Sequence, residues 1–432
     1  MSIDRRSFLQ KIGTLSGAIT VQSFLPESVV TPLETARERV LNMSDDEVAK
    51  DEDFWQQIRQ AYTVSANIMN MNNGGLSPQP RVVQEARERY NNWANEVPSL
   101  FMWRTMKLGK EPLRNNLALL AGCSAEEIAI DRNACEALET VIFGLRLDKG
   151  DEVVLSRQDY PNMMNAWKQR EKRDGIVLKW VDFDVPDMED KKIVEQYNNA
   201  LTNKTKVVHI THIISWTGQI LPVREIANIA KAKNIEVLVD GAQSFAHLVF
   251  NIPDLNCDYY GTSLHKWLCA PFGTGMLYVR KSKIKTLYPL FAAPDPEEDD
   301  IRKFEHLGTR SFAIEQAIGQ AIIFHEYIGG ERKLARLNYL RKYWVEQIKN
   351  LPKVQIITPQ QEGRSAALCL FSVKGSTPQE LGDFLHKDPY RIHTTVVNQE
   401  QYKGVRISPN VYTLTRDLDR LVSAISAFVE TK

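Results

Sequence analysis

Short apolar runs alternate with longer amphipathic stretches along most of the chain. Each run is followed by a polar residue, and the runs lie at 127–130, 152–155, 206–211, 237–239 and 258–262. Amphipathic spacing typical of helices is found at 44–65, 82–94, 105–121 and 224–233. Apolar runs of this length predict buried strands, and helices between parallel strands make right-handed crossovers. The pattern predicts an α/β domain with a mostly parallel sheet between helices.

The C-terminal part of the chain has a different pattern, with one long helix before a mixture of strands and helices. We expect that helix at 334–350, and strands at 354–357, 366–373 and 391–397. The sequence Thr377-Pro378-Gln379-Glu380 is a capping box that is expected to start a helix between two of these strands. The pattern predicts a larger domain at 70–330, followed in the sequence by a smaller α+β domain at 331–432.

The N-terminus has the features of an export signal. Arg5 and Arg6 precede Phe8 and Leu9, and a modestly apolar stretch follows at 12–25. Residues 1–30 therefore resemble a twin-arginine signal, which implies the twin-arginine translocase as a partner and a periplasmic location. An ordinary basic amphipathic helix in a cytoplasmic protein is the alternative. No other stretch approaches the length of apolar sequence that a membrane-spanning helix needs.

Composition narrows the class of partner. The 432 residues include 54 basic and 54 acidic side chains, so no net charge favours a nucleic-acid partner. The five cysteines form no C-x-x-C pair, and we expect buried free thiols. His209 and His212 would point to opposite faces of a strand, so no metal site is expected. A small-molecule substrate fits this composition best.

Two residues that follow strands suggest a specific chemistry. Asp240 ends the run at 237–239, and Lys266 follows the run at 258–262. Ligands of open α/β sheets bind beyond the carboxyl ends of the strands, so both side chains are expected in one crevice. Pyridoxal 5'-phosphate (PLP) catalysis uses such a pair, because a lysine holds the aldehyde as an imine and a carboxylate pairs with the ring nitrogen. Around this pair, Gln243 is expected at the phenolic oxygen, and Ser263 and His265 at the phosphate.

The order of three motifs adds a family resemblance. The motifs DGAQS, S-x-H-K and P-x-G-x-G begin at Asp240, Ser263 and Pro271. In this order they resemble the class V aminotransferase family of PLP enzymes, and the chain from about residue 70 most resembles its isopenicillin N epimerase-like branch. The resemblance implies a PLP-dependent transferase fold of the aspartate aminotransferase type, with a seven-stranded sheet. It also implies a homodimer and an N-terminal helical segment at 31–69 that packs on the small domain.

The same resemblance implies further site residues. A helix start with exposed backbone donors suits the phosphate, and Asn133, Ala134 and Cys135 occupy that place. Tyr160 and Ser215 would contact the cofactor, Tyr160 by stacking where desulfurases have a histidine. Thr309 would reach the phosphate from the neighbouring subunit. The substrate carboxylate would meet Arg406, with the backbone at Asn73 and Gly74 nearby. Taken singly, each residue also fits a plain cap, turn or core position.

The reaction itself stays open between several outcomes. Cysteine desulfurases have a reactive cysteine on a loop before the arginine, and no cysteine lies between Arg391 and Val405. We expect Lys266 to act as general base at the Cα of an amino-acid substrate, as an aminotransferase or an epimerase. A C–S lyase is the alternative, and a cofactor-binding protein without catalysis is the alternative outside the enzymes.

Overall fold

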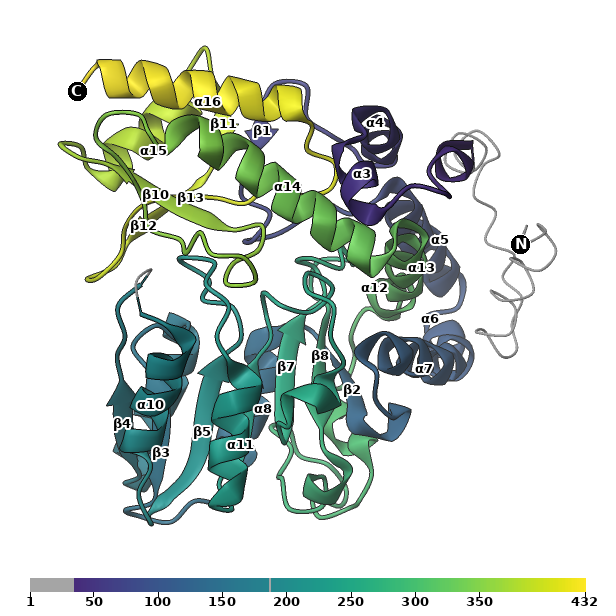
Figure 1. The fold of residues 1–432 in the computed structure, drawn as a ribbon. Helices are drawn as coiled ribbons and strands as arrows, with labels where there is room; N and C mark the ends of the chain where they lie inside the picture. The colour runs from purple at the N-terminus through teal and green to yellow at the C-terminus, as the bar shows by residue number, and fades with distance from the viewer. Residues whose placement is uncertain (1–34, 186–187) are drawn as a thin grey trace.

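The computed structural model describes residues 35–185 and 188–432, so the twin-arginine segment expected at 1–30 lies outside the described residues. A seven-stranded sheet has the order β2-β8-β7-β6-β5-β3-β4 (Figure 1). Its strands are β2 (Ile128–Asp131), β3 (Glu152–Ser156), β4 (Val177–Val181), β5 (Thr205–Thr211), β6 (Glu236–Asp240), β7 (Tyr259–Ser263) and β8 (Gly275–Val279). Only β8 pairs antiparallel with its neighbours. The expected α/β fold with a mostly parallel seven-stranded sheet is confirmed.

Helices cover both faces of this sheet because its strands are apolar on both sides. The crossover helices are α8 (Ala134–Gly144), α9 (Pro161–Asp174), α10 (Asp190–Ala200) and α11 (Val223–Ala232). In β6, Val237 and Val239 pack into the apolar cluster on the α10 and α11 side. Leu238, between them, packs into a second cluster with α8 and α9. Alternate residues thus bury opposite faces, as expected for strands inside a doubly covered sheet.

A second, antiparallel sheet lies above the first in Figure 1 and has the order β12-β13-β10-β9. Its strands are β9 (Val354–Ile356), β10 (Cys369–Val373), β12 (Thr395–Asn398) and β13 (Lys403–Ile407). The helices of this region are α14 (Gly330–Ile348), α15 (Pro378–His386) and α16 (Thr415–Glu430). The capping box at Thr377 and Glu380 is present and starts α15. This arrangement agrees with the smaller α+β unit expected from the sequence, while the boundaries at 70 and 330 stay a prediction.

The expected strand at 391–397 is wrong, because the chain changes partner within it. Its first part, β11 (Ile392–His393), pairs with β1 (Met69–Asn70) in a separate two-stranded sheet. Its second part becomes β12 and pairs with β13. The short sheet ties the segment before the large sheet to the C-terminal region.

The expected single helix at 44–65 is also wrong, since Asp51 divides it into α3 (Asp45–Lys50) and α4 (Glu52–Gln60). The Asp51 side chain accepts a hydrogen bond from Phe54 N and caps the second helix. Both helices lie beside α14, where the buried Arg336 donates to Ala49 O at 2.8 Å and to Glu52 at 2.6 Å. These two helices therefore pack on α14, while the N-terminal segment expected at 31–69 stays a prediction.

The remaining helices lie beside the β2 edge of the large sheet (Figure 1). They are α5 (Arg81–Glu96), α6 (Pro98–Leu100), α7 (Lys110–Ala121), α12 (Phe312–Gln316) and α13 (Ile318–Ile328). The helix expected at 105–121 is shorter than predicted, because a π-helical turn (Phe101–Thr105) and a 3-10 turn (Met106–Gly109) precede α7. Within the described residues, no helix has both the length and the apolar character that crossing a bilayer requires.

Candidate active site

A cavity of about 460 Å³ opens between the large sheet and the C-terminal sheet, and most of the predicted site residues line it. Those that line it are Gly74, Asn133, Ala134, Cys135, Tyr160, Ser215, Asp240, Gln243, Ser263, His265, Lys266 and Arg406. Asn73 and Thr309 do not. The acid at the end of β6 and the lysine after β7 therefore meet in one crevice, as their positions after neighbouring parallel strands predicted.

Asp240 is held at the floor of this cavity. Its side chain is only 4% exposed, and its Oδ1 accepts a hydrogen bond of 2.9 Å from Ala242 N. Burial raises the pKa of the carboxyl, while the Ala242 bond and the charges of His209 and Lys266 lower it. The next residue, Gly241, has to be a glycine because a Cβ at this position would overlap the Tyr260 ring. The tight packing behind the acid fixes its direction.

Lys266 lines the same cavity and is half-buried, on a short turn that follows β7. Burial lowers the pKa of its amine to about 8, against the raising effect of the nearby Asp240. An amine with such a pKa is partly neutral near physiological pH, and the neutral form is the one that attacks an aldehyde or accepts a proton.

The start of α8 forms an end of the cavity suited to an anion. Asn133 caps the helix, since its Oδ1 accepts from Glu136 N at 2.9 Å. The Ala134 amide donates to Ser263 Oγ at 2.9 Å, which joins the helix start to the end of β7. His265 contributes a ring whose Nδ1 lies 3.0 Å from the Thr274 carbonyl. A helix N-terminus, a hydroxyl and an imidazole together match the needs of a phosphate group.

Tyr160 places an aromatic face in the cavity at the first turn of α9. It is 41% exposed although it lines a cavity, so its ring is free to cover a ligand. The preceding Asp159 is buried and accepts hydrogen bonds from Ser156 and Thr211, which fixes this turn to the ends of two strands. Burial raises the pKa of the Tyr160 phenol, and the charge of Arg406 lowers it. The phenol therefore stays protonated at neutral pH.

Gln243 is more constrained than the sequence indicated. Its Nε2 donates to Gly74 O at 2.7 Å, and its Oε1 accepts from Trp267 Nε1 at 2.8 Å. The Trp267 ring stacks on His247 with centroids 3.8 Å apart. One amide hydrogen of Gln243 remains for a phenolic oxygen. The contacts also connect the residue after Lys266 to the turn at Gly74.

Arg406 projects from β13 and is 6% exposed. It donates to Ser215 O at 2.6 Å, to Asn72 Oδ1 at 2.8 Å and to Thr395 Oγ1 at 3.2 Å. All three acceptors are neutral, and within residues 35–185 and 188–432 no carboxylate lies in ion-pair range of this guanidinium. Burial lowers its pKa to about 10. A buried cation without a counter-ion in a cavity favours an anionic ligand.

Asn72 and Thr395 are site residues that sequence reasoning missed. Both line the cavity and hold Arg406, and Thr395 also donates a hydrogen bond to Asn72 Oδ1. The neighbouring amides of Asn73 and Gly74, expected to face a carboxylate, are instead occupied by Ser408, with Asn73 N 3.1 Å from its carbonyl and Gly74 N 3.0 Å from its hydroxyl. In this turn the residue that contacts Arg406 is the adjacent Asn72, whereas the roles expected for Asn73 and Gly74 stay a prediction. No local signal in the sequence distinguishes these positions.

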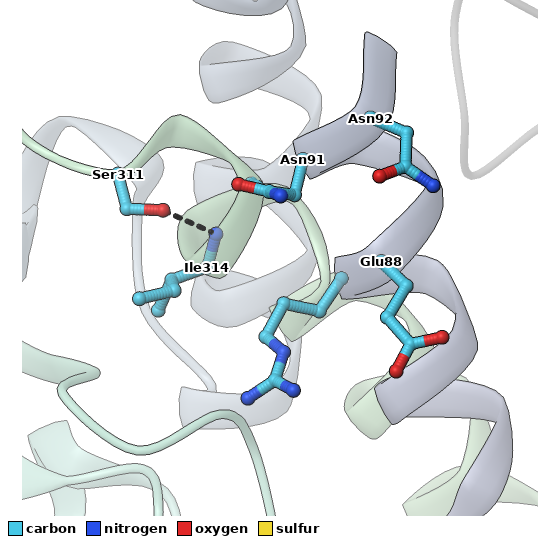
Figure 2. Close-up of a pocket in the computed structure, with 7 residues that line it drawn as sticks. Glu88, Asn91, Asn92, Ser311 and Ile314 are labelled. Atoms are coloured by element: carbon cyan, nitrogen blue, oxygen red, sulfur yellow. Dashed lines mark hydrogen bonds between the residues drawn. The ribbon is translucent and has the colours of Figure 1, made fainter. Parts of the chain in front are cut away.

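Thr309 lies on an exposed loop away from the cavity of its own chain. The next residue, Arg310, forms an ion pair with Glu315. A second cavity of about 540 Å³ is found near this loop, between α5 and α12 (Figure 2). It is lined by Arg87, Glu88, Asn91, Asn92, Ser311, Ala313 and Ile314, and Ser311 Oγ is occupied by Ile314 N. None of the predicted site residues lines it.

The donor set of the first cavity fits PLP. It offers an amine for the aldehyde, a carboxylate for the ring nitrogen, an aromatic face and a helix start for the phosphate. Nowhere among the described residues do three or more His, Cys, Asp or Glu side chains gather as metal ligands. The arrangement therefore supports covalent binding of an aldehyde cofactor next to a site for a carboxylate.

Comparison with known proteins places this geometry in a family. The model of the aminotransferase class-V family matches residues 68–421. The chain is 27% identical over 392 residues to isopenicillin N epimerase from Streptomyces clavuligerus, covering 86% of this chain and 98% of that protein. It is 27% identical over 345 residues to a probable cysteine desulfurase from Synechocystis sp., covering 76% and 81%. Among solved structures, the apo cysteine desulfurase from Thermococcus onnurineus has a TM-score of 0.77 at 22% identity, covering 87% and 98%.

Proposed function

Because the chain belongs to the aminotransferase class-V family of PLP-dependent enzymes, we propose that it changes a bond at the Cα of an amino-acid substrate. The observation that carries the proposal is the buried Arg406 cation, which has only neutral partners and shares one cavity with Lys266 and Asp240. Such a cation gains most from a ligand carboxylate, because the ligand then supplies the missing counter-charge.

The residues of the cavity divide the chemistry between them. PLP, when bound, supplies an electron sink that stabilises negative charge at Cα. Asp240 would keep the ring nitrogen protonated, and Arg406 would orient the substrate by its carboxylate. Lys266 Nζ would then accept the proton from Cα, a role that suits an amine whose pKa is near 8. Tyr160, at the start of α9, would cover the ring and exclude water from one face.

Two outcomes of this proton transfer remain as candidates. In an aminotransferase the proton would not return to Cα and a keto acid would be released, whereas in an epimerase a proton would return to the opposite face of Cα. The likeness to isopenicillin N epimerase over 98% of that protein supports the second. Desulfuration has less support, since no cysteine lies between Arg391 and Val405. Cys369 is buried in β10, and burial raises its pKa to about 11.

We also propose that the protein is a homodimer in which each subunit contributes to both active sites. We further propose that the twin-arginine translocase exports it to the periplasm. Thr309 supports the first part, because it is exposed on a loop away from its own cavity. Arg5, Arg6, Phe8 and Leu9 support the second.

The visible spectrum of the purified protein and proton exchange together test the proposed function. The holoenzyme is expected to show an imine absorbance band that borohydride removes and that is missing from Lys266→Ala. Incubation with a panel of amino acids in deuterated water is expected to exchange the Cα proton. Exchange with keto-acid formation would identify an aminotransferase, and exchange with loss of optical rotation an epimerase. A normal imine band with no exchange in any amino acid would contradict the proposal.

A further inference from the structure

We propose that the substrate side chain is uncharged, so that the enzyme selects amino acids with neutral side chains over their charged isosteres. The inference rests on the proposed function, because it concerns the part of the same cavity that would hold the side chain. It is drawn from the distribution of charge along the cavity wall.

The charged residues that line the cavity are Asp240, Lys266 and Arg406. Each already has a partner in the proposed function, namely the ring nitrogen, the aldehyde and the substrate carboxylate. The ring of His265 is neutral, because burial lowers its pKa to about 4. No charged group among the described lining residues remains to meet a charged substrate side chain.

The cavity wall next to Arg406 is formed by apolar side chains and a primary amide. Trp216 follows Ser215, whose carbonyl accepts from Arg406. Thr395 also accepts from Arg406, and strand alternation places Val397 on the same face of β12. Trp216, Val397 and Gln399 all line the cavity. The side chain of a substrate held by Arg406 would therefore meet an indole, an isopropyl group and a primary amide.

This wall is fixed in place by packing. The Trp216 ring lies 6.0 Å from the Tyr402 ring, and Val397 and Tyr402 are buried in one apolar cluster. The Tyr402 hydroxyl lies 3.1 Å from Gln158 Nε2, across the junction between the two sheets. If Trp216 or Val397 turned away so that a charged side chain could take its place in the wall, its contact with Tyr402 would be lost.

A neighbouring subunit would not add a free cation through the loop of Thr309. Arg310, the only cation beside Thr309, is paired with Glu315 and lies 3.8 Å from Glu305. Its side chain is 12% exposed. A charged side chain in the cavity would thus lose water without gaining a partner, which disfavours its binding.

Pairs of nearly isosteric amino acids test the inference on the holoenzyme. The pairs are L-glutamine with L-glutamate, L-asparagine with L-aspartate, and L-norleucine with L-lysine. Exchange of the Cα proton in deuterated water, followed by NMR, gives kcat/KM for each. The neutral member is expected to have a kcat/KM at least about tenfold higher than its charged isostere. Equal or faster exchange of the charged members would overturn the inference and leave the proposed function in place.

Two variants at one position sharpen the test. Gln399→Arg introduces a cation into the wall, and Gln399→Met is the matched neutral control. The preference for L-glutamine over L-glutamate is expected to fall about tenfold or more in Gln399→Arg and to persist in Gln399→Met. A preference that is the same in both variants would overturn the placement of the side chain. Exchange with no amino acid, glycine included, would overturn the proposed function and this inference together.

Discussion

The buried guanidinium of Arg406 donates hydrogen bonds to three acceptors, and all three are neutral. Asn72 Oδ1 receives hydrogen bonds from Arg406 and from Thr395, so it sets the direction of the guanidinium without neutralising it. An acid at this position would supply the counter-charge permanently. A substrate carboxylate would then compete with an internal one.

The substitution Asn72→Asp tests this balance. It keeps the size of the side chain but adds a negative charge 2.8 Å from Arg406 in the present geometry. We expect KM for the amino-acid substrate to rise about tenfold or more, with a smaller effect on kcat. Asn72→Ala removes the hydrogen bond without adding charge and should raise KM less. Steady-state kinetics measure both, and an unchanged KM in Asn72→Asp would contradict the role given to Arg406.

Lys266 gives a prediction about pH in the cofactor-free protein. Burial lowers the pKa of its amine to about 8, and only the neutral amine attacks an aldehyde. The rate at which PLP attaches should therefore rise with pH up to about 8 and level off above it. Stopped-flow absorbance of the apoprotein mixed with PLP gives this profile. A rate that keeps rising beyond pH 10, as for an ordinary lysine, would show that the pKa of this amine is not lowered.

Motif and strand position were enough to predict residues that the structure brings to one cavity, but not those whose position depends on contacts between distant segments. Asp240 and Lys266 follow neighbouring strands, so the sheet brings them together. Asn72 meets Arg406 across 334 positions of the chain. Its neighbour Asn73 has the same side chain but is buried, donating to Ser408 O at 2.8 Å. Only the tertiary structure decides which of two adjacent asparagines faces the cavity.

At the scale of elements, the start of α8 depends on a glycine in another strand. A Cβ on Gly275, the first residue of β8, would lie 2.5 Å from Asn133 N and 2.6 Å from Asn133 Cα. These are backbone atoms, so the helix start would have to move. The last residue of the P-x-G-x-G motif is thus required to be glycine, because only a residue without a Cβ lets β8 approach the proposed phosphate site this closely.

The substitution Gly275→Ala should displace the N-terminus of α8 and weaken cofactor binding by about tenfold. Titration of PLP into the apoprotein measures the affinity, and thermal unfolding measures the accompanying loss of stability. Gly319→Ala is the matched control, because nothing lies within 4 Å of the added Cβ and the position is in α13. We expect that control to bind PLP normally. Equal affinities in the two variants would contradict the role of α8.

The elements that the sequence placed wrongly share one physical cause. The amphipathic spacing at 44–65 continues through Asp51, yet that side chain caps α4 and ends α3. The segment 391–397 is rich in β-branched residues and is expected as one strand, but its two parts pair with β1 and β13. Periodicity reports which side of a segment is buried, whereas a cap or a change of strand partner depends on neighbours far along the chain. The central strands were predicted well because burial alone defines them.

At the scale of the molecule, the loop of Thr309 is anchored at its base and exposed at its tip. Glu305, just before it, is buried and bonded to Lys110 at 2.6 Å and to Arg114 at 2.5 Å. Arg310, just after Thr309, is paired with Glu315. Thr309 between them is exposed. A loop with a rigid base and an exposed polar tip is suited to contact another subunit. If the active site is shared, activity in a mixed dimer depends on which subunit supplies Thr309.

Mixed dimers test whether Thr309 completes the site of the partner. Lys266→Ala alone should be inactive, and Thr309→Glu should be nearly inactive because its charge would repel the cofactor phosphate. In a mixed dimer, the subunit with an intact Lys266 would receive an intact Thr309 from the other subunit. Random pairing of the two variants should therefore restore about a quarter of the wild-type activity per subunit. Activity no higher than the mean of the separate variants, with mixed dimers verified by differential tags, would show that each site uses its own Thr309 or none.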